Sequence, residues 1–134
     1  MSKYSFVREK STMQIINLLH FTDRQELRQW LECNHDKVGE CWVVTFVSKC
    51  PEWPAIRYVE VVEEALCFGW IDSTKKKLPD GRLVQRLSPR RKGSHWTELN
   101  IQRCLDLERR GLMTDAGRRV LNKLGIRNGV NVVR

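Results

Sequence analysis

The sequence has no long apolar run and no closely spaced pair of cysteines, and both absences exclude classes of protein. The longest apolar run near the N-terminus, residues 15–19, is short and is interrupted by Asn17. It therefore predicts neither a signal-peptide core nor a membrane span. The five cysteines are odd in number and form no CxxC motif, and three lie in otherwise apolar runs. We expect reduced core thiols in a cytoplasmic protein, with no metal and no cofactor.

Internal repeats and low-complexity tracts are also absent, so we expect residues 1–134 to form a single domain. Apolar residues make up 41% and charged residues 30% of the chain. This balance is typical of a folded chain rather than a disordered one.

The positive charge is concentrated in one segment. The chain has 24 Lys and Arg against 16 Asp and Glu, a formal net charge of +8. Residues 75–119 contain thirteen of the basic and five of the acidic residues, and the rest of the chain has eleven of each. A segregated charge favours an anionic partner over a general effect on solubility.

The N-terminal part predicts a helix preceded by an early strand or an ordered lead-in. Thr22 has the pattern of an N-cap, and Gln25 three residues later completes a capping box. We expect the helix over about residues 23–33, with a strand or an ordered segment over residues 13–21.

The next segment predicts a central strand and a second helix. Residues 41–47 form a β-branched and aromatic run without polar alternation, which is typical of a strand covered on both faces. From Tyr58 the apolar residues recur at helical spacing. We expect the solvent face of this helix to be formed by Glu60, Glu63 and Glu64.

A β-hairpin and two further helices complete the predicted order. Residues 68–76 and 82–87 are expected to pair as antiparallel strands about a Pro-Asp-Gly turn. Gly69 indicates a bulge or a close approach of backbone within the first strand. A helix capped by Ser94 or Thr97 and a short one capped by Thr114 follow. We predict an α+β fold: a small, mostly antiparallel sheet with a basic β-hairpin, packed by about four helices.

Several motifs in this order resemble a known family. They are ALCFGWIDS at residues 65–73, Pro89-Arg90, SxWTxxN at residues 94–100 and GLMTxAG at residues 111–117. Together they resemble the YdeI/OmpD-associated family, also called bacteriocin-protection proteins. The resemblance covers a core of residues 20–124, between a lead-in (residues 1–20) and a C-terminal tail (residues 125–134).

Two departures accompany the resemblance. Thr97 replaces the family's usual serine and keeps a hydroxyl cap, whereas Cys50 replaces the second residue of a lysine pair. The resemblance implies a role in stress or antimicrobial-peptide resistance, which is a phenotype rather than a chemistry.

The expected working surface is the basic hairpin, its following loop and the next helix start. Lys75 to Lys77 and Arg90 to Lys92 flank this hairpin, and we expect the two clusters to meet beside it. Guanidinium groups next to free backbone N–H groups at a helix start suit a phosphate or carboxylate. The alternative is a solvated basic edge that prevents strand-to-strand aggregation. The candidate ligand-binding residues are Trp70, Asp72, Lys75, Arg86, Arg90, Arg91, Ser94, Trp96 and Asn100.

Asp72 follows an apolar run and needs a donor if it is buried. Arg86 on the paired strand is its expected partner, with Lys75 second. This pair is either purely structural or, with Arg90, the floor of a small-ligand pocket.

We therefore expect a non-catalytic module that binds an anionic ligand or a protein partner. The first alternative is nucleic-acid binding through the same surface, with Trp70 and Trp96 stacking on bases, although no RNP, KH, zinc-finger or clear helix-turn-helix motif is present. The second is an enzyme with a pocket near Asp72 and Trp96, for which Cys67 and His95 are the available nucleophile and base.

Overall fold

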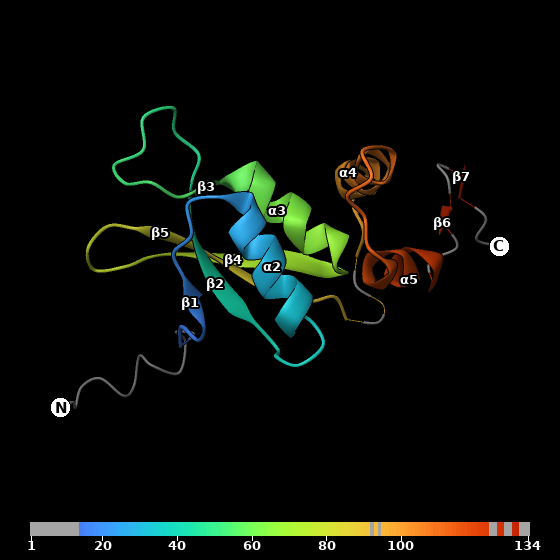
Figure 1. Ribbon diagram of the computed structural model, residues 1–134, viewed down its shortest axis with the longest axis horizontal. Helices are drawn as coiled ribbons and strands as arrows, with labels where there is room; N and C mark the ends of the chain where they lie inside the picture. The colour runs from blue at the N-terminus through green and yellow to red at the C-terminus, as the bar shows by residue number, and fades with distance from the viewer. Residues whose placement is uncertain (1–13, 92, 94, 124–125, 128–129, 132–134) are drawn as a thin grey trace.

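The computed structural model describes residues 14–91, 93, 95–123, 126–127 and 130–131. Helices and strands are mixed along the chain (Figure 1). They are β1 (Leu18–Leu19), α2 (Arg24–Asn34), β2 (Cys41–Phe46), β3 (Ile56–Arg57), α3 (Tyr58–Cys67), β4 (Trp70–Lys77), β5 (Leu83–Pro89), α4 (Glu98–Arg109), α5 (Asp115–Lys123), β6 (Ile126–Arg127) and β7 (Val130–Asn131). The fold is α+β, as the sequence predicted.

The main sheet has the strand order β1-β2-β5-β4, and β3 also pairs with β2. β2 pairs antiparallel with β5, and β5 pairs antiparallel with β4, while the two-residue strands β1 and β3 run parallel to β2. β2 is therefore central in the sheet, which confirms the prediction drawn from its unbroken apolar run. β4 forms an edge of the sheet in the described part of the chain.

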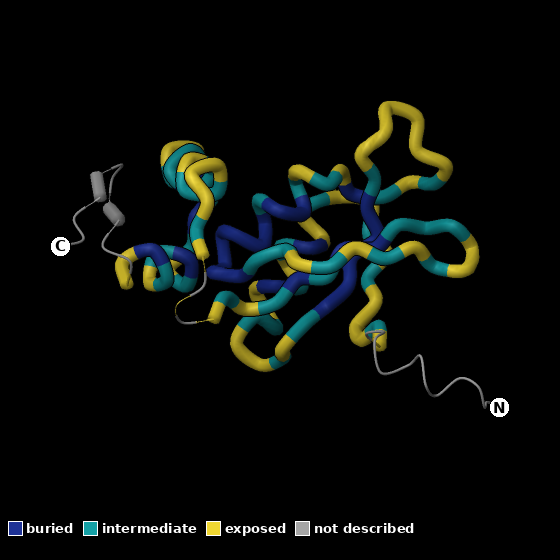
Figure 2. The backbone as a smooth tube through the Cα atoms, turned by 180° about the vertical axis from the view of Figure 1, so that it is seen from behind, coloured by how far each residue is buried: buried dark blue, intermediate teal, exposed yellow. Residues whose placement is uncertain are grey.

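Helices α2 and α3 cover one face of the sheet (Figure 1). The core on that face joins apolar residues of both helices to the inward-facing residues of β2 and β5, and it appears as the buried interior in Figure 2. A smaller buried cluster of Trp42, Val44 and Val84 lies on the opposite face, packed by Ile15 and Trp53. Because both faces of β2 are buried, its sequence has no polar alternation.

The predicted hairpin is confirmed. Its strands run from the pair Trp70 and Pro89 at the open end to the pair Lys77 and Leu83 near the turn. The register shifts between Asp72 and Lys75, which marks a β-bulge in the edge strand.

Helix α2 begins one residue later than predicted. Asp23 is its N-cap and accepts a hydrogen bond from the Gln25 amide (2.8 Å), while Glu26 accepts one from the Asp23 amide (3.1 Å). The capping box was predicted at Thr22 and Gln25, and that assignment is wrong. Two overlapping pairs of residues fit the pattern, and the structure uses the one with two carboxylates, which accept stronger hydrogen bonds.

Close backbone contact joins the end of α3 to α5. Gly69 has φ of +77°, and a Cβ atom there would lie 2.7 Å from Val120 Cγ2. At Gly117 a Cβ atom would lie 2.5 Å from the Cys67 carbonyl oxygen. The close approach predicted at Gly69 is confirmed, and its partner is α5.

The chain ends are described only in part. A strand and an ordered segment were both left open for the region before α2, and the structure has the short strand β1 there. β6 pairs antiparallel with β7. Residues 1–13, 92, 94, 124–125, 128–129 and 132–134 lie outside the described residues. None of the helices in the described part has the length and apolar character that a membrane crossing requires.

Candidate functional site

Asp72 lies at the centre of a group of polar side chains on the α3 side of the sheet. Tyr58, the first residue of α3, donates its hydroxyl to Asp72 Oδ2 over 2.8 Å. The Nζ atom of Lys75 lies 4.2 Å from the centroid of the Tyr58 ring. The β-bulge places Asp72 and Lys75 on the same face, although they are three residues apart.

Arg90 approaches the same region from the segment after β5. Its backbone amide donates to the Gly69 carbonyl (3.1 Å), and its guanidinium carbon lies 3.6 Å from the centroid of the Trp96 ring. Its Nη1 atom donates to the His95 carbonyl (3.2 Å). Arg90 is therefore held in one orientation by stacking and by hydrogen bonding at once.

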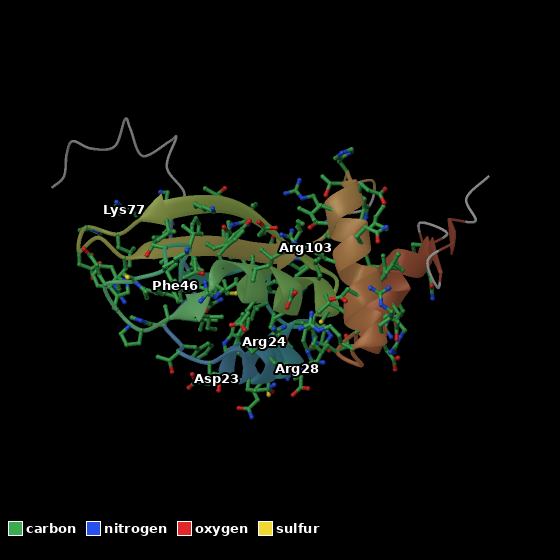
Figure 3. All side chains as sticks on the ribbon, turned by 90° about the horizontal axis from the view of Figure 1, so that it is seen from above. Asp23, Arg24, Arg28, Phe46, Lys77 and Arg103 are labelled. Carbon is green, nitrogen blue, oxygen red and sulfur yellow. The ribbon has the colours of Figure 1, made fainter. Side chains whose placement is uncertain are left out.

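Helix α4 contributes further polar side chains to the same region. Thr97 caps the helix by accepting a hydrogen bond from the Asn100 amide (3.1 Å), and Asn100 Oδ1 accepts one from Arg103 Nη1 (3.0 Å). Arg103 lies on the side of α4 that borders α3 and the sheet (Figure 3), and its positive charge acts on Tyr58. We call this group the Asp72 cluster; it consists of Tyr58, Asp72, Lys75, Arg90, Trp96, Asn100 and Arg103.

Burial sets the charge states in the Asp72 cluster. Burial, followed by the hydrogen bond to Asp72, raises the pKa of Tyr58 to about 12, so its hydroxyl stays neutral and keeps its proton. Burial also lowers the pKa of Arg90, while the negative charge of Asp72 acts in the opposite direction. A half-buried guanidinium of this kind gives up part of its hydration before any ligand arrives.

Arg86 is not the partner of Asp72, and that prediction is wrong. Asp72 lies opposite Leu87, whereas Arg86, the preceding residue on β5, points to the other face of the sheet. There Arg86 forms an ion pair with Glu40 (2.9 Å) and approaches the Ser73 and Ser88 hydroxyls. Arg86 therefore does not join Asp72 and Arg90 in the floor of one pocket.

Three further predicted residues are not members of the Asp72 cluster. Trp70 is buried and packs edge-on against Trp30, and its indole N–H donates to the His35 carbonyl (3.3 Å). Arg91 is exposed, and Ser94 lies outside the described residues. Sequence reasoning missed Tyr58, which is distant in sequence from the motifs around Asp72 and Arg90. It also missed Arg103, although Arg103 lies one helical turn after the candidate Asn100, so helical spacing could have found it.

The two basic clusters of the hairpin lie at opposite ends of it. Lys77 is paired with Leu83 near the turn, whereas Arg90 and Arg91 follow Pro89 at the open end. Figure 3 shows Lys77 far from Arg103 on α4. At about 3.4 Å per residue, Lys77 lies roughly 20 Å from Arg90 along the hairpin, so the expectation that the two clusters meet as a whole is wrong. Of the first cluster, Lys75, which lies over the Tyr58 ring, belongs to the Asp72 cluster.

Ion pairs neutralise part of the positive charge of residues 75–119. Within residues 75–119, five arginines form ion pairs in the described part of the chain, and two of their partners, Glu40 and Glu63, come from outside that segment. These arginines are Arg82, Arg86, Arg109, Arg110 and Arg118. The Asp72 cluster as defined above contains three cations, Lys75, Arg90 and Arg103, and one carboxylate.

A family model described as Domain of unknown function (DUF8412) matches residues 19–120. The chain belongs to the DUF8412 family. The match runs from β1 into α5 and includes every residue of the Asp72 cluster. No curated protein and no solved structure matches the chain.

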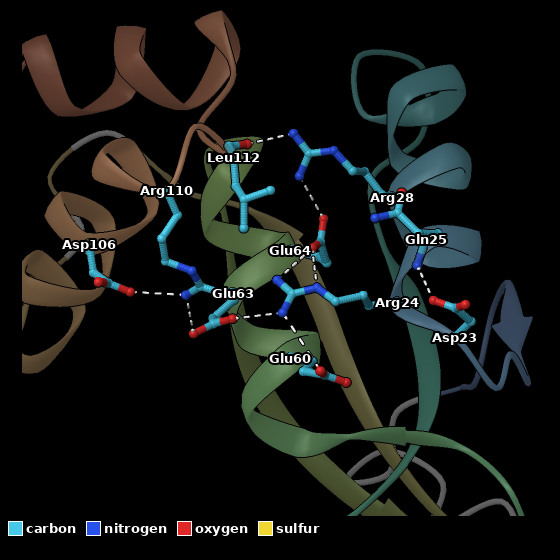
Figure 4. Close-up of polar contacts among 10 residues, drawn as sticks. All are labelled: Asp23, Arg24, Gln25, Arg28, Glu60, Glu63, Glu64, Asp106, Arg110 and Leu112. Carbon is cyan, nitrogen blue, oxygen red and sulfur yellow. Dashed lines mark hydrogen bonds and ion pairs between the residues drawn. The ribbon is translucent and has the colours of Figure 1, made fainter.

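A buried ionic network joins three helices of this DUF8412 domain (Figure 4). Glu64, only 1% exposed, accepts from Arg24 (2.7 Å) and Arg28 (3.0 Å), and Arg28 also donates to the Leu112 carbonyl. Arg110, the C-cap residue of α4, forms an ion pair with Glu63 of α3 (3.2 Å). The prediction that Glu64 lies on a solvent face is wrong, because α2 covers this side of α3. The spacing of polar residues shows which face of a helix is polar, but it does not show whether that face meets solvent or the arginines of a second helix.

Three of the five cysteines of the DUF8412 domain are buried thiols. Cys41, Cys67 and Cys104 are buried, and burial raises their pKa values to about 12, 11 and 12 respectively, so all three remain thiols. Cys33 and Cys50 are exposed. Among the described residues, no group of three or more His, Cys, Asp or Glu side chains is arranged to hold a metal ion.

Proposed function

We propose that the protein is a non-catalytic binding module that recognises a small anionic ligand at the Asp72 cluster. The observation that carries this proposal is a group of three cations around the Tyr58–Asp72 hydrogen bond. Lys75 lies over the Tyr58 ring, the charge of Asp72 acts on Arg90, and the charge of Arg103 acts on Tyr58. Lys75 comes from β4, Arg90 from the segment after β5 and Arg103 from α4.

The cations are held before a ligand arrives. Arg90 is stacked on Trp96, Lys75 lies over Tyr58, and Arg103 is oriented by Asn100. Preorganised groups lose little side-chain entropy on binding, which favours recognition of a specific anion over diffuse attraction.

A binding role fits the chemistry of the neighbouring side chains better than catalysis does. Cys67 and Cys104 have raised pKa values and are buried, so neither provides a thiolate near neutral pH. A nucleic-acid function is less favoured, because Trp70 is buried and the Trp96 ring already stacks with Arg90.

We further propose that this binding serves stress or antimicrobial-peptide resistance inside the cytoplasm. This part rests on the resemblance of the sequence motifs to the YdeI/OmpD-associated family. Bacteria that express the wild-type chain should survive an antimicrobial peptide better than bacteria that express the Arg103→Gln variant at the same level.

The proposed ligand chemistry is tested by titration with inorganic phosphate, followed by tryptophan fluorescence at low ionic strength. We expect saturable binding to the wild-type chain and at least a fivefold rise in Kd for Arg103→Gln, because one of three charge-assisted contacts is lost. Arg91→Gln is the matched control, since it removes the same charge from an exposed neighbour of Arg90.

The control should change Kd less than twofold. Equal weakening by both substitutions would show that only the net charge matters, and the assignment of the Asp72 cluster would be wrong. Binding that is unaffected by both would place the anion elsewhere on the protein.

A further inference from the structure

Asp72 is unexpected in a site for an anion, because its carboxylate repels a negative ligand at close range. Its Oδ2 atom accepts the Tyr58 hydroxyl (2.8 Å), and this is the one hydrogen bond that the described residues give to its side chain. An ionised carboxylate accepts about four hydrogen bonds. Asp72 therefore has acceptor capacity that a hydrogen-bond donor on a ligand can use.

The charge of the Asp72 cluster also restricts the ligand. Three cations and one carboxylate leave a charge of +2 when Tyr58 is neutral. A monocarboxylate balances half of this charge, whereas a phosphate monoester, with about −1.5 to −2 at pH 7, balances nearly all of it. Guanidinium groups such as those of Arg90 and Arg103 also match the geometry of phosphate oxygens.

Building on the proposed function, we infer that the ligand is a small phosphate monoester with a free hydroxyl group near its phosphate. Lys75, Arg90 and Arg103 bind the phosphate, and Asp72 accepts a hydrogen bond from the hydroxyl. Asp72 thus acts as a specificity-determining residue. It favours such an ester over inorganic phosphate, whose only hydroxyl is on the phosphorus that the cations hold, and over a polyanion, whose next phosphate would face the carboxylate.

The position of Tyr58 supports this division of roles. Its single proton is committed to Asp72, and its ring lies under Lys75, so one side chain orients both the acceptor and a cation. Tyr58→Phe removes the competing donor but leaves Asp72 charged, so it should keep the preference for a hydroxylated ligand.

The test compares glycerol 3-phosphate with inorganic phosphate by calorimetric titration of the full chain at pH 7.5. For the wild type we expect glycerol 3-phosphate to bind about tenfold more tightly, which corresponds to one hydrogen bond to a charged acceptor. In Asp72→Asn this preference should fall below threefold, while inorganic phosphate binds as tightly as before or more tightly. Asn has nearly the same shape and can still accept the Tyr58 hydroxyl, and thermal unfolding checks that each variant is folded.

The outcomes separate this inference from the proposed function. Equal affinity of the wild type for both compounds, or an unchanged preference in Asp72→Asn, overturns the role of Asp72 and leaves anion binding intact. If Tyr58→Phe also loses the preference for glycerol 3-phosphate, the tyrosine and not Asp72 alone is its source, and the inference is overturned. If neither compound binds, the proposed function fails together with the inference.

Discussion

Two glycines, Gly69 and Gly117, determine how closely α5 approaches the end of α3. Gly117 lies against the Cys67 carbonyl, and the Thr114 hydroxyl and amide both donate to the same carbonyl oxygen. This contact fixes α5 beside the start of β4, where Gly69 makes the reciprocal approach. The sequence indicated a close approach at Gly69 from its place between two aromatic residues. Gly117 lies in a helix, where nothing in the local sequence indicates its contact.

Gly117→Ala should destabilise the protein by about 2 kcal/mol, because the new methyl group has no space beside Cys67 and Met113. Gly39→Ala is the control, since a Cβ atom there meets nothing within 4 Å. Urea unfolding of both variants measures the difference. Equal stability of the two would contradict the close packing of α5 on α3.

At the scale of elements, helix α2 connects the sheet to the remaining helices. Its capping box fixes where it begins, and Arg24 and Arg28 then reach Glu64 on α3. Burial opposes the charge on both arginines, but hydrogen bonds and the nearby negative charges raise their pKa values overall. The network orients α2 against α3 and, through Leu112, against the loop between α4 and α5.

Asp23→Ala should cost about 1 kcal/mol of stability, because it removes the N-cap of α2. Thr22→Ala should cost less than about 0.5 kcal/mol, since its hydroxyl lies 3.5 Å from Glu26 and caps nothing. The comparison, made by chemical unfolding, distinguishes the observed capping box from the overlapping one. A larger effect at Thr22 would reverse the assignment.

Glu64→Gln should destabilise the protein by about 3 kcal/mol, because two largely buried guanidinium groups lose their common carboxylate. Glu60→Gln removes the same charge from a side chain that is 39% exposed and lies 3.7 Å from Arg24, and it should have an effect below about 1 kcal/mol. Thermal unfolding of the pair gives the readout. Similar melting temperatures would mean that the network contributes little.

At the scale of the whole molecule, the stability should have a broad maximum in pH. Hydrogen bonds from Arg86 and Arg118 hold the pKa values of Glu40 and Glu108 below their ordinary value of 4.5, so stability is lost as the pH falls below about 5. Buried thiols have raised pKa values, and in the unfolded chain they ionise near 9. The folded chain then holds more protons than the unfolded one, so stability also falls above about pH 9.

Urea midpoints measured under reducing conditions from pH 3 to pH 10.5 test this prediction. Glu40→Gln should flatten part of the acid slope and leave the alkaline slope unchanged. A midpoint that stays constant above pH 9 would contradict the burial of the three thiols.

The order of the elements was predictable because each carries a local signal. The helical spacing after Tyr58, the unbroken apolar run of β2 and the turn between β4 and β5 all depend on neighbours in sequence. The candidate site was only partly predictable. Asp72, Lys75, Arg90, Trp96 and Asn100 lie in or beside the basic segment and share one region, as their sequence positions suggested.

The rest of the site depends on register and on contacts distant in sequence. A one-residue difference in register decides which face of β5 carries Arg86, and the β-bulge brings Lys75 to the face of Asp72. Tyr58 reaches this region only because α3 packs beside it. Such contacts leave no mark in the local pattern of the sequence.

The central claim is that an anion binds at the Asp72 cluster, and its location is measured most directly by amide and indole NMR shifts during a titration with inorganic phosphate. We predict that the Trp96 indole resonance and the amides of residues 90, 91 and 95–103 move together and saturate with one Kd. The indole resonances of the buried Trp42 and Trp70 should move much less. Shifts confined to Lys76, Lys77 and the hairpin turn, or no saturable shift at Trp96, would contradict the claim.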